Sequence, residues 1–106
     1  MLQVSVVMPT HNRWAQLQRV LEGYREIAFP REAFEVIVCD DASDDDTPEQ
    51  IRAFIETAPF TLRYLHQEKK GPAAARNMGI NAATAPPYFA TSPSSYRIKR
   101  RSSSAF

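Results

Sequence analysis

The sequence contains little of what stabilises or anchors several common classes of small protein. Its single cysteine, Cys39, excludes an internal disulfide and a zinc-finger site, and its place in an apolar run predicts a reduced, buried thiol. No apolar stretch approaches the roughly 18 residues of a membrane span, and no charged-then-apolar leader opens the chain. We therefore expect a cytoplasmic protein, at most peripheral to a membrane. A chain of 106 residues holds at most one small domain.

Acidic residues are absent from the C-terminal third of the chain. Residues 1–68 hold all 12 acids and six of the 13 bases, a formal charge of −6, whereas residues 69–106 hold no acid and seven bases, a formal charge of +7. An asymmetry of this size predicts either contact with a nucleic acid or an anionic membrane, or an abnormal C-terminus.

Three apolar runs alternate with three segments of helical spacing. The runs at residues 4–8, 34–39 and 61–66 predict strands, and helices are predicted to begin near residues 14, 47 and 73. This order predicts an α/β fold, doubly wound around a parallel sheet of three strands or slightly more. In such sheets ligands bind beyond the carboxyl ends of the strands, which selects the loops at residues 9–13, 40–46 and 67–72.

The first two loops carry polar side chains that suit a nucleotide. An imidazole such as His11 stacks on a planar base, and Arg13 meets a phosphate or an acid, although a solvated turn that caps the following helix fits this loop equally well. In the second loop, Asp40 or Asp41 is positioned to accept hydrogen bonds from a nucleobase imide or a ribose hydroxyl. No G-x-G-x-x-G motif is present, which argues against NAD or FAD. The next three acids, residues 44–46, favour the positive end of the following helix over a metal site.

The third loop leads into a helix whose first residues are small. Gly71 and the alanines after it allow the backbone to approach a ligand or the sheet closely. Arg76, one turn inside the helix, is expected to point either at diphosphate oxygens or at the acids of the neighbouring loop. An ion pair between Arg76 and an aspartate would order that acid and keep it ionised.

Three spaced motifs, VSVVMPTHNR, FEVIVCDDASDDDT and LRYLHQEKKGPAAARNMGINAA, resemble the start of a family 2 glycosyltransferase. The resemblance covers about residues 3–83 and implies the Rossmann-like nucleotide-binding half of a GT-A fold. It implies an inverting transfer of a sugar from a UDP-, GDP- or dTDP-sugar to a hydroxyl of an acceptor glycan or lipid. The donor-binding residues that it implies are Pro9, Thr10, His11, Arg13, Asp40, Asp41, Gly71 and Arg76, with His11 where the family often has a base-stacking tyrosine.

The sequence departs from this family after residue 83. The family continues into a strand and an acidic motif that holds a divalent metal, Mn or Mg, against the diphosphate, but this chain has no acid after Glu68. The acceptor-binding half with its catalytic base is also absent, so no metal ligand or catalytic base is assigned. We expect residues 1–83 to form an incomplete nucleotide-binding domain and residues 84–106 to form a disordered basic, Ser/Pro-rich tail, as a disrupted reading frame would produce.

Two consequences and two alternatives follow for function. A chain with only the donor-binding half is expected to show little transferase activity, because rate comes from contacts that strengthen in the transition state. A sheet that lacks its fourth strand would expose an apolar edge and favour self-association. The alternatives are a non-catalytic module that binds a nucleotide or nucleotide sugar, and, less favoured, a binder of nucleic acid or anionic lipid through the bases at residues 97–101.

Overall fold

The computed structural model describes residues 2–26 and 30–89 and contains four strands, three α-helices and one short 3-10 helix. The predicted alternation of strands and helices is confirmed. In chain order the elements are β1 (Val4–Thr10), α1 (Trp14–Arg25), η1 (Arg31–Ala33), β2 (Phe34–Asp41), α2 (Thr47–Thr57), β3 (Thr61–Gln67), α3 (Pro72–Ala82) and β4 (Pro87–Phe89).

The four strands form one parallel sheet in the order β3-β2-β1-β4. Val4 of β1 lies opposite Phe34 of β2, and Thr10 lies opposite Asp40, so the two strands run together over their whole length. The central strand β2 is buried along all eight residues, as expected for a parallel strand covered on both faces.

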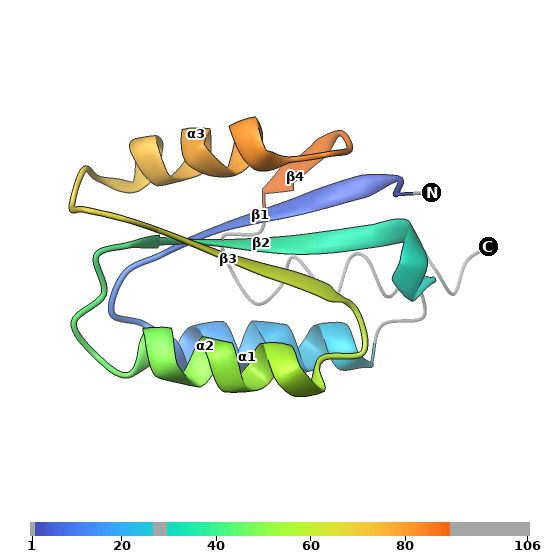
Figure 1. Ribbon diagram of the computed structural model, residues 1–106, viewed down its shortest axis with the longest axis horizontal. Helices are drawn as coiled ribbons and strands as arrows, with labels where there is room; N and C mark the ends of the chain where they lie inside the picture. Colours follow the sequence, from blue (N-terminus) through green and yellow to red (C-terminus); the bar gives the residue numbers. More distant parts are fainter. Residues whose placement is uncertain (1, 27–29, 90–106) are drawn as a thin grey trace.

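Helices cover both faces of the sheet and make three layers (Figure 1). The helices α1 and α2 lie on one face, where Val6, Val36 and Val38 contribute to the larger apolar cluster. On the other face α3 packs on a smaller cluster formed by Val7, Ile37, Cys39 and Ala75. The predicted burial of Cys39 is confirmed, and this burial raises the pKa of its thiol to about 11.

The helix α3 approaches the sheet most closely at Gly79. A Cβ atom at this position would lie 2.5 Å from Val7 Cγ1 and 2.6 Å from Cys39 Sγ, closer than carbon and sulfur atoms pack. The glycine therefore sets the distance between α3 and the sheet, and with it the position of the loop that precedes the helix.

The expectation that a fourth strand is missing is wrong. Residues Pro87–Phe89 pair with Ser5–Val7 of β1, and Ser5 N donates to Pro86 O at 3.0 Å. Two of the first residues of the predicted tail, Thr84 and Ala85, also form hydrogen bonds with the strands. The part of β1 beside these residues is therefore a paired strand and not an open edge.

A buried carboxylate ties this connection to the sheet, at the end opposite the loops predicted to bind a ligand. Glu35 Oε2 accepts hydrogen bonds from Ser5 Oγ at 2.6 Å, Thr84 Oγ1 at 2.8 Å and Thr84 N at 3.1 Å. Its other oxygen accepts from Arg63 Nη1 at 3.2 Å. Burial alone would raise the pKa of Glu35, but these hydrogen bonds outweigh it and lower the pKa.

The rest of the predicted tail, residues 90–106, lies outside the described residues, and so do the bases at residues 97–101. Its disorder and the nucleic-acid or lipid-binding alternative stay predictions. Within the part of the chain that the structure describes, none of the helices has the length and apolar character needed to cross a membrane.

Candidate donor-binding site

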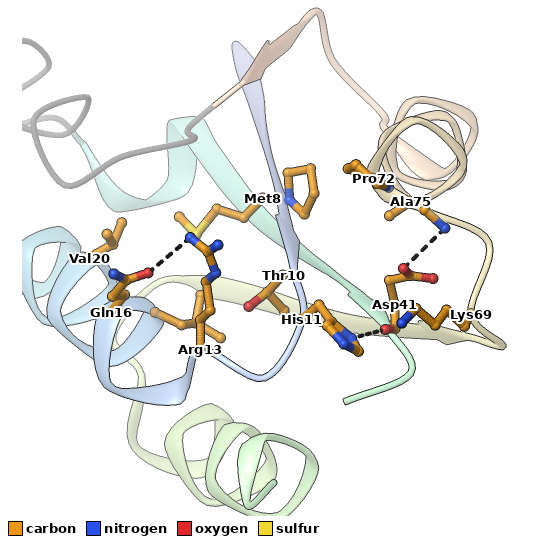
Figure 2. Close-up of a pocket in the computed structure, with 13 residues that line it drawn as sticks. Met8, Thr10, His11, Arg13, Gln16, Val20, Asp41, Lys69, Pro72 and Ala75 are labelled. Atoms are coloured by element: carbon orange, nitrogen blue, oxygen red, sulfur yellow. Dashed lines mark hydrogen bonds between the residues drawn. The ribbon is translucent and has the colours of Figure 1, made fainter. Parts of the chain in front are cut away.

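The three predicted loops meet at the carboxyl ends of β1, β2 and β3 and surround a cavity of about 390 Å³ (Figure 2). Register brings them together, because Thr10 lies opposite Asp40 and Asp41 lies opposite Gln67. The cavity is lined by Met8, Pro9, Thr10, His11, Arg13, Gln16, Leu17, Val20, Asp41, Lys69, Gly71, Pro72 and Ala75. Its wall is thus largely apolar, with a few convergent polar groups, as is common in small-molecule sites.

Asp41 is the polar group most firmly held in this cavity. Its Oδ1 accepts hydrogen bonds from Lys70 N at 2.8 Å and Gln67 Nε2 at 3.0 Å, and its Oδ2 accepts from Gly71 N at 3.1 Å. The backbone N–H of Lys70, followed by the amide of Gln67, holds the pKa of Asp41 below its ordinary value. The carboxylate also lies at the N-terminus of α3, where the helix dipole favours a negative charge.

The imidazole of His11 is held by hydrogen bonds at both nitrogens. Its Nδ1–H donates to the backbone carbonyl of Asp41, and its Nε2 accepts from Asn12 Nδ2 at 3.3 Å. Since both ring nitrogens already have protein partners, the ring offers a ligand chiefly its flat face. This geometry suits stacking on a planar group.

Asn12, which sequence analysis did not select, joins the first two loops. Its backbone N–H donates to Ser43 Oγ at 2.8 Å, and its Oδ1 accepts from Asp44 N at 2.6 Å and from Asp45 N at 3.2 Å. Asn12 has a φ of 50°, a conformation that asparagine tolerates better than most residues. An asparagine two residues after the end of a strand was the signal that could have identified it.

The side chain of Asp40 points away from the cavity, whereas Asp41, the next residue, lines it. Its Oδ1 accepts from Ser43 N at 3.0 Å, and its Oδ2 accepts from Tyr64 Oη at 2.5 Å. Burial, followed by the hydrogen bond to Asp40, raises the pKa of Tyr64. Asp40 therefore holds the second loop through Ser43 and does not line the cavity.

Arg76 also lies outside the cavity lining. Its guanidinium carbon lies 5.6 Å from the ring centroid of Phe89, and it forms no ion pair with Asp40 or Asp41 among the described residues. Of the two orientations expected for Arg76, the ion pair with an aspartate is therefore not formed, and backbone N–H groups bind Asp41 instead. The cations that do line the cavity are Arg13 and Lys69, of which Lys69 was not predicted.

The backbone conformation at position 71 explains why the residue there is glycine. Its φ of 96° lies in the region that other residues avoid, and α3 begins at the next residue. This turn brings the N–H groups of Lys70 and Gly71 onto the Asp41 carboxylate. Of the eight predicted residues, the cavity thus brings together six, namely Pro9, Thr10, His11, Arg13, Asp41 and Gly71.

The acids in this region do not fit a divalent metal. Across residues 2–26 and 30–89, no group of three or more His, Cys, Asp or Glu side chains gathers at one point. Asp45, from the acidic run, accepts from Thr47 N at 3.0 Å at the start of α2, which agrees with the predicted role of this run at a helix N-terminus.

The sequence matches one family, and the match runs across most of the described fold. The sequence model of the family described as Glycosyl transferase family 2 covers residues 5–92. A validoxylamine A glucosyltransferase of Streptomyces hygroscopicus subsp. jinggangensis is 40% identical over 85 residues, which are 78% of this chain and 20% of the relative. The chain thus spans about a fifth of the length of this relative.

Solved structures show the same fold. The structure of S. aureus TarS 1-349 in complex with UDP has a TM-score of 0.77 and 27% identity, over 87% of this chain and 28% of that one. The mannosyltransferase PcManGT from Pyrobaculum calidifontis, in complex with GDP-Man and Mn2+, has a TM-score of 0.73 and 36% identity, over 77% of this chain and 24% of that one.

Proposed function

This chain belongs to glycosyl transferase family 2, and on that premise we propose that its cavity binds the nucleotide of a nucleotide-diphosphate sugar. The observation that carries the proposal is the convergence of six residues from the three strand-end loops on one cavity. That cavity lies beyond the carboxyl ends of parallel strands, where doubly wound folds bind ligands. TarS and PcManGT, whose structures hold UDP and GDP-Man, have this fold.

Each group in the cavity has a chemistry that suits one part of such a donor. The ring of His11 stacks on the base, and the Asp41 carboxylate accepts a hydrogen bond from it. Arg13 and Lys69 supply positive charge for the diphosphate. Asp40 acts as a positioning residue through Ser43. In this proposal Arg76 approaches the phosphates from outside the cavity lining, since its side chain is exposed.

The transfer of the sugar to an acceptor hydroxyl is a property of the longer family enzyme. In this proposal residues 1–83 supply the donor-binding groups, and residues 69–106 hold no acid that could serve as metal ligand or base. We therefore expect the chain alone to bind donor and to transfer little sugar. A non-catalytic module would make the same contacts with the nucleotide. It would differ from the first proposal in that it binds the nucleotide without a catalytic half. A cytoplasmic location and self-association stay predictions.

Calorimetric titration of the 106-residue chain with UDP tests this proposal, after circular dichroism has shown that the chain is folded. Stacking of one base on an aromatic ring contributes about 1–3 kcal/mol, so His11→Ala should weaken binding by about 5- to 150-fold. Gln18→Ala is the matched control, because Gln18 is exposed on α1 and does not line the cavity. A folded chain that binds no nucleotide, or an effect of Gln18→Ala equal to that of His11→Ala, would refute the assignment.

A further inference from the structure

A path of hydrogen bonds runs from β3 across the carboxyl end of β2 to the first loop. Tyr64 Oη, on β3, donates to Asp40 Oδ2 at 2.5 Å, and Asp40 Oδ1 accepts from Ser43 N at 3.0 Å. Ser43 Oγ accepts from Asn12 N at 2.8 Å, and Asn12 Nδ2 donates to His11 Nε2 at 3.3 Å. The path thus ends at a ring that lines the cavity, although Tyr64 itself does not line it.

The Asp40 carboxylate depends on the Tyr64 hydroxyl for its orientation. Asp40 is fully buried, and within the part of the chain that the structure describes its Oδ2 accepts a hydrogen bond from Tyr64 alone. A buried charge is tolerated only when it is hydrogen-bonded, and a hydroxyl that donates to a carboxylate makes one of the stronger hydrogen bonds in proteins. Loss of the hydroxyl would leave Oδ2 without a partner and favour rotation of the carboxylate away from Ser43 N.

The turn that Asp40 closes needs such support. Ala42 lies inside this turn with a φ of 56°, which is unfavourable for a residue that carries a Cβ atom. The hydrogen bond from Ser43 N to Asp40 Oδ1 spans Ala42 and opposes its relaxation to an ordinary conformation. Asn12, in the facing loop, also has a positive φ, and Ser43 Oγ binds its backbone N–H. The first loop is therefore positioned by a strained turn that a side chain holds closed.

On the basis of the proposed nucleotide-binding function, we propose that Tyr64 is a positioning residue for the ring of His11. It acts through Asp40, Ser43 and Asn12 and touches no ligand itself. The Tyr64 hydroxyl keeps the turn closed, the closed turn fixes Asn12, and Asn12 holds one nitrogen of the ring. The affinity of the cavity for a nucleoside diphosphate thus depends on a hydroxyl outside the cavity, on the outermost strand of the sheet next to β2.

Tyr64→Phe tests this role, because it removes the hydroxyl and keeps the ring that packs against the larger apolar cluster. Calorimetric titration of the 106-residue chain should show UDP binding about 3- to 10-fold weaker, a part of what loss of the His11 ring costs. In a His11→Ala background the same substitution should change the affinity by less than about twofold, because the ring through which Tyr64 acts is gone. Tyr24→Phe is the matched control, since it removes a buried tyrosine hydroxyl on α1, away from the cavity lining.

NMR spectra of the nucleotide-free chain give a readout that does not depend on binding. Tyr64→Phe should shift the amide signals of Ser43 and Asn12 and the ring signals of His11, whereas Tyr24→Phe should leave all three unchanged. Ser43→Ala removes the acceptor of Asn12 N and breaks the same path within a loop. It should shift the His11 ring signals and weaken UDP binding to a similar extent, so it also serves if Tyr64→Phe does not fold.

The outcomes separate the positioning role from the nucleotide site on which it rests. If UDP binds and Tyr64→Phe leaves its affinity unchanged, or weakens it equally with and without His11, the positioning role is wrong while the nucleotide site stands. Unshifted His11 ring signals in both Tyr64→Phe and Ser43→Ala overturn the positioning role whether or not UDP binds. A folded chain that binds no UDP overturns the proposed function and this role with it. An affinity loss that disappears in the His11→Ala background supports the role.

Discussion

Replacing Glu35 by glutamine should lower the free energy of unfolding by about 2–4 kcal/mol at pH 7. The side chain of Glu35 is only 3% exposed, and its Oε2 accepts three hydrogen bonds from Ser5 and Thr84. An amide nitrogen in place of Oε2 cannot accept from Thr84 N, although the two hydroxyls can rotate. The ion pair with Arg63 adds little to this value, because the Arg63 side chain is 37% exposed and screened by solvent.

The effect of Glu35→Gln should also depend on pH. The pKa of Glu35 is lowered in the folded chain, so its contribution is present above the unfolded pKa of about 4.3 and is lost as pH falls through the folded pKa. Urea unfolding at pH 7 and at pH 3 should thus show a difference between the two proteins that shrinks in acid. Glu56→Gln, on the exposed face of α2, is the matched control. A loss below about 0.5 kcal/mol at pH 7, or a difference that grows in acid, would refute the account of this network.

Three further predictions concern α3 and the strand-end loops. Gly79→Ala should cost about 1–3 kcal/mol in urea unfolding, because its Cβ would meet Val7 and Cys39, and an equal cost for the exposed control Asn77→Ala would contradict this. Ala42→Gly should raise the unfolding free energy by about 0.5–1 kcal/mol, since Ala42 holds a φ of 56°, and a loss of stability would show that no strain is relieved. Because hydrogen bonds from Lys70, Gln67 and Gly71 lower the pKa of Asp41, affinity for a UDP-sugar, whose substituted diphosphate does not titrate in this range, should stay constant from pH 7 to about pH 5. A fall in that affinity with a midpoint above about pH 5, in a chain that stays folded, would show that Asp41 is not held in its charged form.

The sequence was enough to predict the order of the elements and the three loops. Apolar runs such as residues 34–39 and the helical spacing that begins near residue 14 are strong local signals, and parallel alternation then brings the strand ends together. The sequence could not say which of two adjacent aspartates faces the cavity. Successive side chains alternate between the faces of a sheet, so one of Asp40 and Asp41 must turn inward, and only the packing of α3 decides which.

The fourth strand and the Glu35 network escaped prediction for a related reason. The strand β4 has only three residues, of which the first is Pro87, and it follows Pro86, so it has no apolar run, and its pairing depends on the backbone of β1. Glu35 sits among apolar residues in β2, and its partners Ser5 and Thr84 are 30 and 49 residues away in the chain. Interactions between residues so distant leave no local pattern.

An NMR titration of the isotopically labelled chain with UDP tests the central claim most directly. The account predicts that amide signals of His11, Asp41, Lys70 and Gly71 shift together and saturate, while those of Glu35 and Thr84, at the opposite end of the sheet, stay unchanged. Shifts centred on Glu35 and Thr84, or a folded chain whose signals do not move at millimolar UDP, would contradict the assignment of the nucleotide site.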